Sequence, residues 1–270
     1  EESFKRGVKK CTSDYDSGFI NKEKLIKIFD QILKARHETP MGDSLDHFIS
    51  TNTFDISTFE ISDWIKEWVE TRGLNNLEIV WDKNNAMFSN LIKIKQTMEG
   101  EGAKTLRSHR LKVAFFDYEG QIFKLKDVLV SGQEHSNLIL EDPNRVPHAL
   151  LLDSEGNSLF ASSIETGSLQ FFLNNLHTIT DEFVILTVLQ RFAYMVSTGA
   201  HSSRSYVQLI GRLITQKGEN ISPMELQQAI RFAHYVIREF TPEDHRTELK
   251  NIMYEACSRL LRGDSAVSQI

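Results

Sequence analysis

The stretch LKVAFFDYEGQIFKLKDVLV, residues 111–130, decides the fold. Leu111, Val113 and Phe115 alternate with smaller or charged residues, which is the period of two expected for a strand with one buried face. A second apolar run covers 122–130. The four residues Asp117-Tyr118-Glu119-Gly120 lie between the runs and have the composition of a hairpin loop with Gly at the positive-φ position. The stretch therefore predicts an antiparallel β-hairpin.

Short runs of β-branched and aromatic residues on both sides extend this pattern. They cover 77–81, 91–95, 137–140, 148–152 and 159–162, and polar turns separate them. One such turn is Asp153-Ser154-Glu155-Gly156. Because six or so short strands follow one another without intervening helices, residues 74–165 are predicted to form an antiparallel β-sandwich rather than a parallel sheet.

The sequence before the strands has the helical period. One apolar stripe contains Leu25, Phe29 and Ile32, and it lies in a segment that His37-Glu38-Thr39-Pro40 ends. A second segment begins at a Ser57/Glu60 capping box and ends at Gly73. Residues 1–73 are therefore predicted to be helical.

The helical period returns after the strands. Thr180 is predicted to cap a helix that ends at Gly199, and a shorter helix is predicted over 202–216. Ser222-Pro223-Met224-Glu225 reads as a capping box, and Thr241-Pro242-Glu243-Asp244 is predicted to repeat the device. Residues 166–270 are thus predicted to form an α-helical solenoid or bundle.

Composition narrows the classes of function. The 270 residues are 40% hydrophobic, which is enough for a substantial core, and 31 Lys and Arg against 37 Asp and Glu give a net charge of -6. This charge excludes the general attraction on which nucleic-acid binders depend, so no nucleic-acid partner is expected. Two distant cysteines form no disulfide framework and fit a reducing compartment, and the chain shows no bilayer-spanning run or signal peptide. We expect a cytoplasmic protein with no membrane segment.

A search for reaction chemistry finds no catalytic, cofactor-binding or metal-binding residues to assign. No two of the nine histidines are three or four residues apart, as a zinc peptidase helix requires, and Pro40 interrupts the helix at His37-Glu38. The glycines of Gly100-Glu101-Gly102 have acidic neighbours that repel phosphate, so a flexible hairpin loop is the better interpretation.

The remaining candidates have structural interpretations. A Gly-x-Ser-x-Gly nucleophile motif is missing, and Cys257 lies on the expected inner face of a helix, where a small core residue is favoured over a nucleophile. Trp64 and Trp68 are one turn apart, which favours core packing over ligand stacking. The basic cluster Lys5, Arg6, Lys9 and Lys10 is interpreted as a solvated helix face.

Several segments, in this order, resemble the C-terminal half of aminopeptidase N-type zinc aminopeptidases, the gluzincin group that includes puromycin-sensitive aminopeptidases. Residues 2–10, with the sequence ESFKRGVKK, are similar to the family's E-x-F-x-x-G-[LV] helix, and 61–73 to the Trp-containing helix that closes the catalytic domain. Residues 91–96 and 146–156 resemble strands of the family's sandwich, and 179–191 resembles the opening of its C-terminal helical domain. A Gly-Leu-Asn-Asn sequence at 73–76 replaces the family's Gly-Tyr-Pro turn, which makes the chain a distant relative.

The resemblance implies a position within a larger protein. In the family, the zinc-binding helix, the downstream Glu ligand, the exopeptidase motif and the transition-state Tyr all precede the helix that 2–10 resembles, so no catalytic residue is transferred to this chain. The implied domains are the helical end of a catalytic-type domain at 1–73, a β-sandwich at 74–165 and the start of a solenoid at 166–270. The implied partners are a missing N-terminal catalytic domain and, through the active site of that parent protein, peptides. Zinc is expected in the parent protein and not in this chain.

Three hypotheses remain open. The first is a non-catalytic C-terminal portion of a zinc metalloaminopeptidase that removes N-terminal residues from peptides and is inactive alone. The second is a zinc-less, aminopeptidase-like scaffold that keeps the fold without the metal site. The third is an unrelated adaptor whose solenoid binds partners on a concave face.

Overall fold

The structure is a computed structural model that describes residues 66–68, 70–81, 91–99, 105–131, 134–140, 142, 145–156 and 158–263. The chain divides into two compact units, Glu1–Thr71 and Arg72–Ile270, and each is described by itself. Within the first unit, residues 66–68 are helical. The helices predicted before residue 66, Trp64, His37, the basic cluster at residues 5–10 and the Gly100–Gly102 loop lie outside the described residues.

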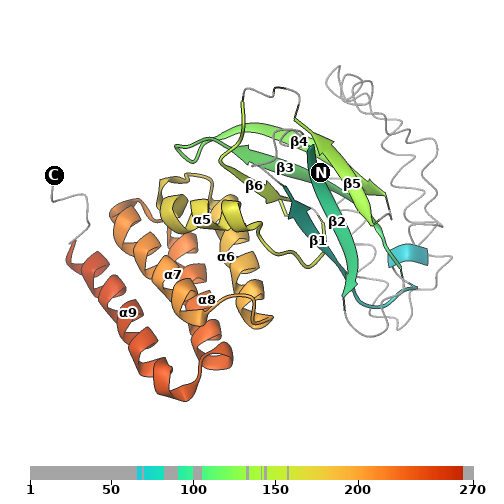
Figure 1. The fold of residues 1–270 in the computed structure, drawn as a ribbon. Helices are drawn as coiled ribbons and strands as arrows, with labels where there is room; N and C mark the ends of the chain where they lie inside the picture. The colour runs from blue at the N-terminus through green and yellow to red at the C-terminus, as the bar shows by residue number, and fades with distance from the viewer. Residues whose placement is uncertain are drawn as a thin grey trace, which may run out of the picture. The chain divides into compact units, whose positions relative to one another are not determined.

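The second unit begins with two three-stranded antiparallel sheets (Figure 1). One sheet has the order β1-β2-β5, formed by Leu74–Val80, Leu91–Glu99 and His135–Ile139. The other has the order β4-β3-β6, formed by Ile122–Ser131, Ser108–Phe116 and Ala149–Leu152. The predicted hairpin is confirmed as β3 and β4, with Gly120 at a φ of 86° in the turn.

Side chains from both sheets form one apolar cluster. Successive side chains of a pleated strand point to opposite faces, so one face of each sheet contributes its side chains to this cluster. The strands β1, β2 and β5 contribute Leu77, Ile92 and Leu138, and β3, β4 and β6 contribute Val113, Val130 and Leu150, all at most 2% exposed. The antiparallel pairing and the mixed α and β composition are thus confirmed.

The strand predicted over 159–162 is wrong. Only Ala161 pairs there, through a single parallel bridge to Asn76. The side chain of Asp153 accepts a hydrogen bond from the Ser158 amide at 2.9 Å, and Leu159 is 64% exposed, so the segment touches β1 at one residue before the next helix begins.

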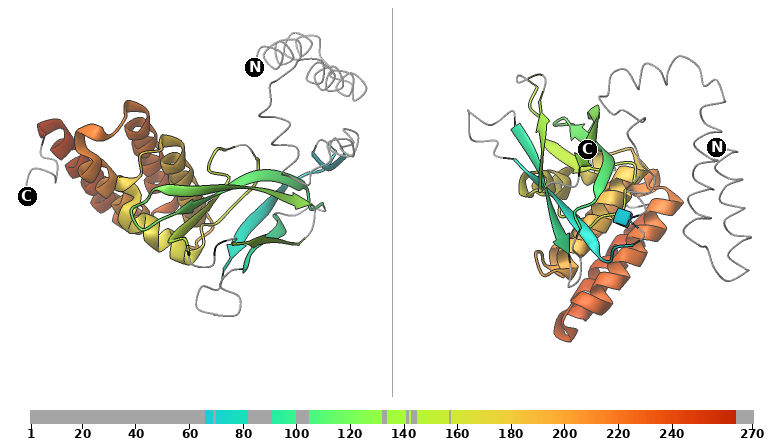
Figure 2. Two further views of the ribbon diagram at one scale, coloured as in Figure 1. Left: turned by 90° about the horizontal axis from the view of Figure 1, so that it is seen from above. Right: turned by 90° about the vertical axis from the view of Figure 1, so that its right-hand side faces the viewer.

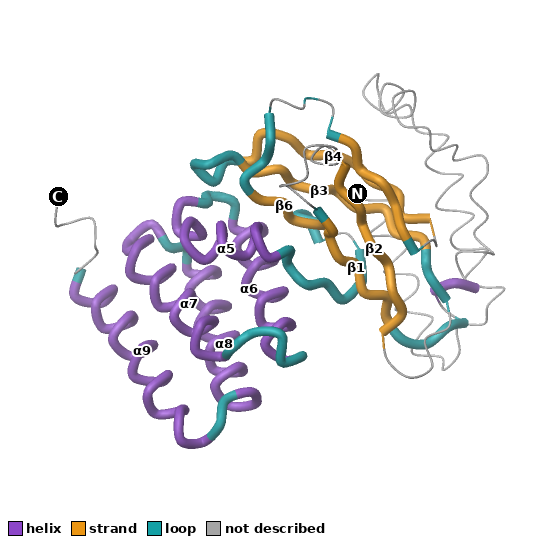
Figure 3. The backbone as a smooth tube through the Cα atoms, viewed as in Figure 1, coloured by secondary structure: helices purple, strands orange, loops and turns teal. Residues whose placement is uncertain are grey.

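The described helices of the second unit follow the strands in sequence (Figures 2 and 3). They are α5 (Thr166–Asn175), α6 (Glu182–Ser197), α7 (Ser203–Lys217), α8 (Pro223–Phe240) and α9 (Glu243–Arg262), with the short 3-10 turns η2 (Leu176–Thr178) and η3 (Gly218–Asn220). Helix α6 packs against α8 and α7 packs against α9, so alternate helices stack on each other.

Two predicted helix starts are corrected. The helix predicted to begin at Thr180 is capped instead by Asp181, whose carboxylate accepts the Phe183 and Val184 amides. At the second predicted start, the Thr241 hydroxyl donates to the Val236 carbonyl at 3.2 Å, at the C-terminal end of α8, and α9 begins without a side-chain cap. The capping box at Ser222 is confirmed, with Pro223 at the first helical position.

Aromatic and hydrogen-bond contacts join the strands to the helices. The Phe116 and Phe172 rings are both fully buried and meet edge to face with centroids 5.3 Å apart. The Ser168 hydroxyl accepts the Leu150 amide at 3.0 Å. The Thr178 hydroxyl donates to the Glu119 carbonyl at 3.0 Å, and it lies so close to Gly120 that a Cβ there would be 2.6 Å from the hydroxyl oxygen. The second sheet and α5 therefore share one core.

Candidate functional site

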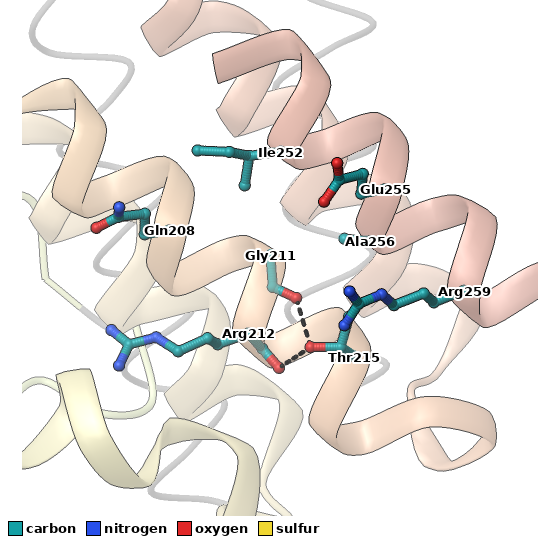
Figure 4. A pocket seen from close by; sticks show the side chains of 8 residues that line it. All are labelled: Gln208, Gly211, Arg212, Thr215, Ile252, Glu255, Ala256 and Arg259. Carbon is teal, nitrogen blue, oxygen red and sulfur yellow. Dashed lines mark hydrogen bonds between the residues drawn. The ribbon is translucent and has the colours of Figure 1, made fainter. Parts of the chain in front are cut away.

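The candidate site is a groove of about 460 Å³ between α7 and α9 (Figure 4). Helix α7 contributes Gln208, Gly211, Arg212 and Thr215, and α9 contributes Ile252, Glu255, Ala256 and Arg259. Within each helix these positions are three or four residues apart, so helical geometry alone places each set on one face. The groove is thus the seam between two stacked helices.

Small residues set the floor of the groove. A Cβ on Gly211 would lie 3.1 Å from Cγ2 of Ile252 and 3.9 Å from Cβ of Ala256. The Ala256 side chain is 3% exposed. The missing side chain at Gly211 therefore lets the two helices approach closely, and the longer side chains of the following turns form the walls.

The walls are polar and charged. Arg259 extends from α9 toward Thr215, whereas the Arg212 side chain points away from α9 (Figure 4). The Thr215 hydroxyl donates to the carbonyls of Gly211 and Arg212, so it is committed to its own helix. The Glu255 and Arg259 side chains are exposed, and they leave both a negative and a positive group for an incoming molecule.

The charge of Arg212 affects a histidine of the neighbouring 3-10 turn. Burial first, and the nearby Arg212 charge second, lower the pKa of His177 below its usual value. His177 is not a lining residue of the groove, whose charged groups are Arg212, Glu255 and Arg259.

The groove offers polar groups to a ligand. Its one hydroxyl is engaged with the Gly211 and Arg212 carbonyls, and Glu255 is the one carboxylate of the lining. Within the part of the chain that the structure describes, no group of three His, Cys, Asp or Glu is arranged to hold a metal ion.

A second polar constellation lies in the strand region. The Nδ1 atom of His109 is 3.1 Å from the Ser158 hydroxyl, and its Nε2 atom is 3.3 Å from Oδ1 of Asn75. This chain of groups has the composition of a nucleophile, base and orienting amide. His109 is only 1% exposed, however, and Asn75 also binds the Thr105 carbonyl and the Arg107 amide, which makes the constellation a buried structural network.

Of the residues singled out from the sequence, the structure describes Cys257 and Trp68, and Cys257 is not among the residues that line the groove. Cys257 lies on α9, half-buried against the helical core, and burial raises the pKa of its thiol, which opposes formation of a thiolate. Trp68 is half-buried in the first unit. Sequence reasoning missed Arg212, Glu255 and Arg259. The sequence shows their helical spacing, but it does not show that α7 packs against α9.

Comparison of the sequence with known protein families and with curated proteins gives no match. Among the described helices, none is both long enough and apolar enough to cross a membrane.

Proposed function

We propose that this chain is the non-catalytic C-terminal portion of a zinc metalloaminopeptidase that removes N-terminal residues from peptides. In this proposal the two sheets are a β-sandwich that acts as a spacer. The helices are the start of an α-solenoid that shapes access to an active site encoded upstream. Zinc belongs to the parent protein, where it would polarise the scissile carbonyl and activate water.

The stacking of alternate helices is the observation that carries the proposal. Helix α6 packs on α8 and α7 packs on α9, which is the arrangement by which helix pairs extend into a solenoid. The strands precede these helices in the order that the sequence resemblance implies. A spacer followed by such an array suits a part that covers a substrate rather than one that carries out chemistry.

The junction between strands and helices supports a positional role. The Phe116 and Phe172 pair and the Ser168 hydrogen bond to Leu150 join β3 and β6 to α5. A helical array that is fixed to its spacer through a shared core holds its groove at a set distance from whatever domain the spacer contacts.

The groove between α7 and α9 supports the substrate class. A peptide carries backbone amides and carbonyls together with charged side chains, and Gln208, Glu255 and Arg259 offer both donors and acceptors to such groups. A long peptide would reach the groove with its distal residues, whereas a short substrate would not.

The test compares substrates of two lengths on the parent protein. Arg259→Ala is expected to leave kcat/KM for an aminoacyl-anilide unchanged and to raise KM for a peptide of about ten residues by about three- to tenfold, the loss expected from one charged contact. Arg231→Ala, a change at an exposed position of α8 outside the groove, is the matched control. Equal effects of both variants on the long peptide would remove the groove from the proposal.

The 270-residue chain alone gives the stricter test. We expect no stoichiometric zinc and no hydrolysis of aminoacyl-anilides by the purified chain. Zinc with activity in this chain would overturn the assignment of the active site to upstream residues. A parent protein that folds but binds no zinc would instead establish the zinc-less scaffold.

A further inference from the structure

A second cavity is lined in part by Phe115 and Leu140, two residues of the apolar cluster that both sheets share. It has a volume of about 240 Å³ and is separate from the groove on the helices. Its floor is the Phe115 ring, which is 1% exposed, and Leu140 forms part of its wall. The remaining lining residues are mostly cationic.

The register of the hairpin places two lysines on the core-facing row of β4. Residues that are directly opposite in an antiparallel pair point to the same face. Val128 and Val130 are opposite Leu111 and His109 and lie in the inter-sheet cluster. The same row continues with Lys126 opposite Val113 and Lys124 opposite Phe115. Core positions are normally apolar, so two lysines in this row are a local exception to the pattern.

A β-bulge supplies the aromatic wall. Phe115 is opposite Lys124, but the next residue, Phe116, is opposite Ile122. The register therefore shifts by one residue at this point. Phe123 is the extra residue, and its ring meets Phe115 at 6.2 Å between centroids. Bulges re-aim side chains in this way at functional sites.

A third cation closes the wall. The Arg145 guanidinium lies 4.2 Å from the centroid of the Phe123 ring, within the range of a cation–π contact. The lining contains one acidic residue, Asp142, and three basic residues, Lys124, Lys126 and Arg145. Lys124, Lys126 and Asp142 also interact with other groups, so a ligand would join an existing charged network. The lining is nevertheless cationic in a chain whose net charge is -6.

From this juxtaposition we propose that the cavity binds a small organic anion. Its carboxylate or phosphate meets Lys124 and Lys126, and its apolar body lies on the Phe115 ring. The cavity volume corresponds to about eight water molecules at about 30 Å³ each, which limits the ligand to a small molecule. Oxyanions suit lysines because ammonium groups donate charge-assisted hydrogen bonds to them.

The experiment measures the binding of four probe molecules to the 270-residue chain by calorimetry and by amide chemical shifts. The ionic strength is held at about 0.15 M, because nonspecific surface attraction is screened there. Phenyl phosphate and phenylacetate carry the two candidate anionic groups on an apolar ring. Inorganic phosphate tests the anion alone, and benzyl alcohol tests the ring alone. We expect one ring-bearing anion to bind more tightly than either partial probe, and the tighter of the two identifies the anionic group.

Two variants locate the site. Lys126→Gln is expected to weaken binding of the preferred anion about tenfold, the loss of one charge-assisted hydrogen bond. Lys93→Gln removes an exposed lysine from β2, away from the cavity, and is expected to leave binding unchanged. If Lys126→Gln fails to fold by circular dichroism, Lys124→Gln replaces it with the same expectation.

Three results would overturn the proposal. Binding of neither ring-bearing anion would exclude the site. Equal effects of Lys126→Gln and Lys93→Gln would place the anion elsewhere. Benzyl alcohol or inorganic phosphate binding as tightly as the ring-bearing anions would remove the combined recognition that the Phe115 floor and the lysine row imply.

Discussion

The strand region, 74–165, and the helical region, 166–263, bury different kinds of side chain. Within the described residues, the buried polar groups of the strand region are Asn75, Gln96, Arg107, His109, Asp153, Ser154 and Ser162, whereas those of the helical region are Ser168, Glu225 and Thr241. The helices are joined mainly by apolar side chains such as Phe192 and Ile210, both fully buried. The comparison indicates that side-chain hydrogen bonds stabilise the packing of the strands, whereas apolar contact and end caps stabilise the helices.

The largest effect is expected where the two regions share a core. Phe116→Ala removes a fully buried ring that contacts Phe172, and a change of this kind costs about 3–5 kcal/mol of unfolding free energy. In a chain with Trp64 and Trp68 replaced by Phe, fluorescence of Trp81 reports the strands, and ellipticity at the helix band reports the helices. We expect the two unfolding transitions to coincide in the unchanged chain and to separate in Phe116→Ala.

Phe183→Ala is the matched control, because the Phe183 side chain is 67% exposed on α6. It should change the unfolding free energy by less than about 0.5 kcal/mol. Coincident transitions and a loss below about 1 kcal/mol in Phe116→Ala would show that the two regions do not depend on this contact.

The next effect concerns the buried polar network of the strands. Asn75→Ala removes a side chain that donates to the Thr105 carbonyl at 2.9 Å and accepts the Arg107 amide at 3.0 Å. Buried backbone groups that lose their partners cost about 2–3 kcal/mol together, and urea unfolding measures this loss. Asn76→Ala, at the neighbouring half-buried position, should cost less than half as much. Equal costs would mean that the network adds nothing to stability.

The sequence predicted the hairpin and the helices better than this network. The alternation at Leu111, Val113 and Phe115 is periodic, and the Ser222 capping box is local, so both are readable without knowledge of neighbours. The hydrogen bond from Gln96 to the Arg107 carbonyl, at 2.8 Å, joins β2 to the residue before β3 and leaves no periodic trace. The same limit explains why the groove residues Arg212 and Arg259 were missed, because only the packing of α7 on α9 places them in one groove.

The pH dependence of the unfolding free energy should also distinguish the two regions. The expected change is similar to that of Asn75→Ala or smaller. Burial, and secondarily the Arg107 charge, lower the pKa of His109 from 6.5 to about 4. Between these values the unfolded chain takes up a proton that the folded chain does not. Stability should therefore be constant above about pH 7 and fall by about 2–3 kcal/mol as the pH drops from 6.5 to 4.

His109→Gln is expected to flatten the pH profile in that window, measured as urea midpoints at half-unit steps. His177→Gln is the control in the helical region, where the pKa of the histidine is also lowered but the side chain is only partly buried. A profile that His177→Gln flattens more than His109→Gln would assign the acid sensitivity to the helices and reverse the comparison.

The smallest expected effect tests the end caps of the helices. The Ser222 hydroxyl accepts the Glu225 amide at 3.1 Å, and the Glu225 carboxylate accepts the Ser222 amide at 3.0 Å and also pairs with Lys217. Ser202 caps α7 by accepting the Ser205 amide at 3.2 Å, but no capping box accompanies it.

Ser222→Ala should lower the unfolding free energy by about 1–2 kcal/mol and Ser202→Ala by about 0.5–1 kcal/mol, measured by thermal unfolding. The difference would come from the reciprocal bonds and from the hydrogen bond that the Ser222 hydroxyl donates to the Glu182 carboxylate, because both changes remove one hydroxyl from one helix start. Equal costs would mean that Glu225 stabilises the fold through Lys217 alone, and the helical region would then depend on a buried charge pair in the way that the strand region depends on its polar network.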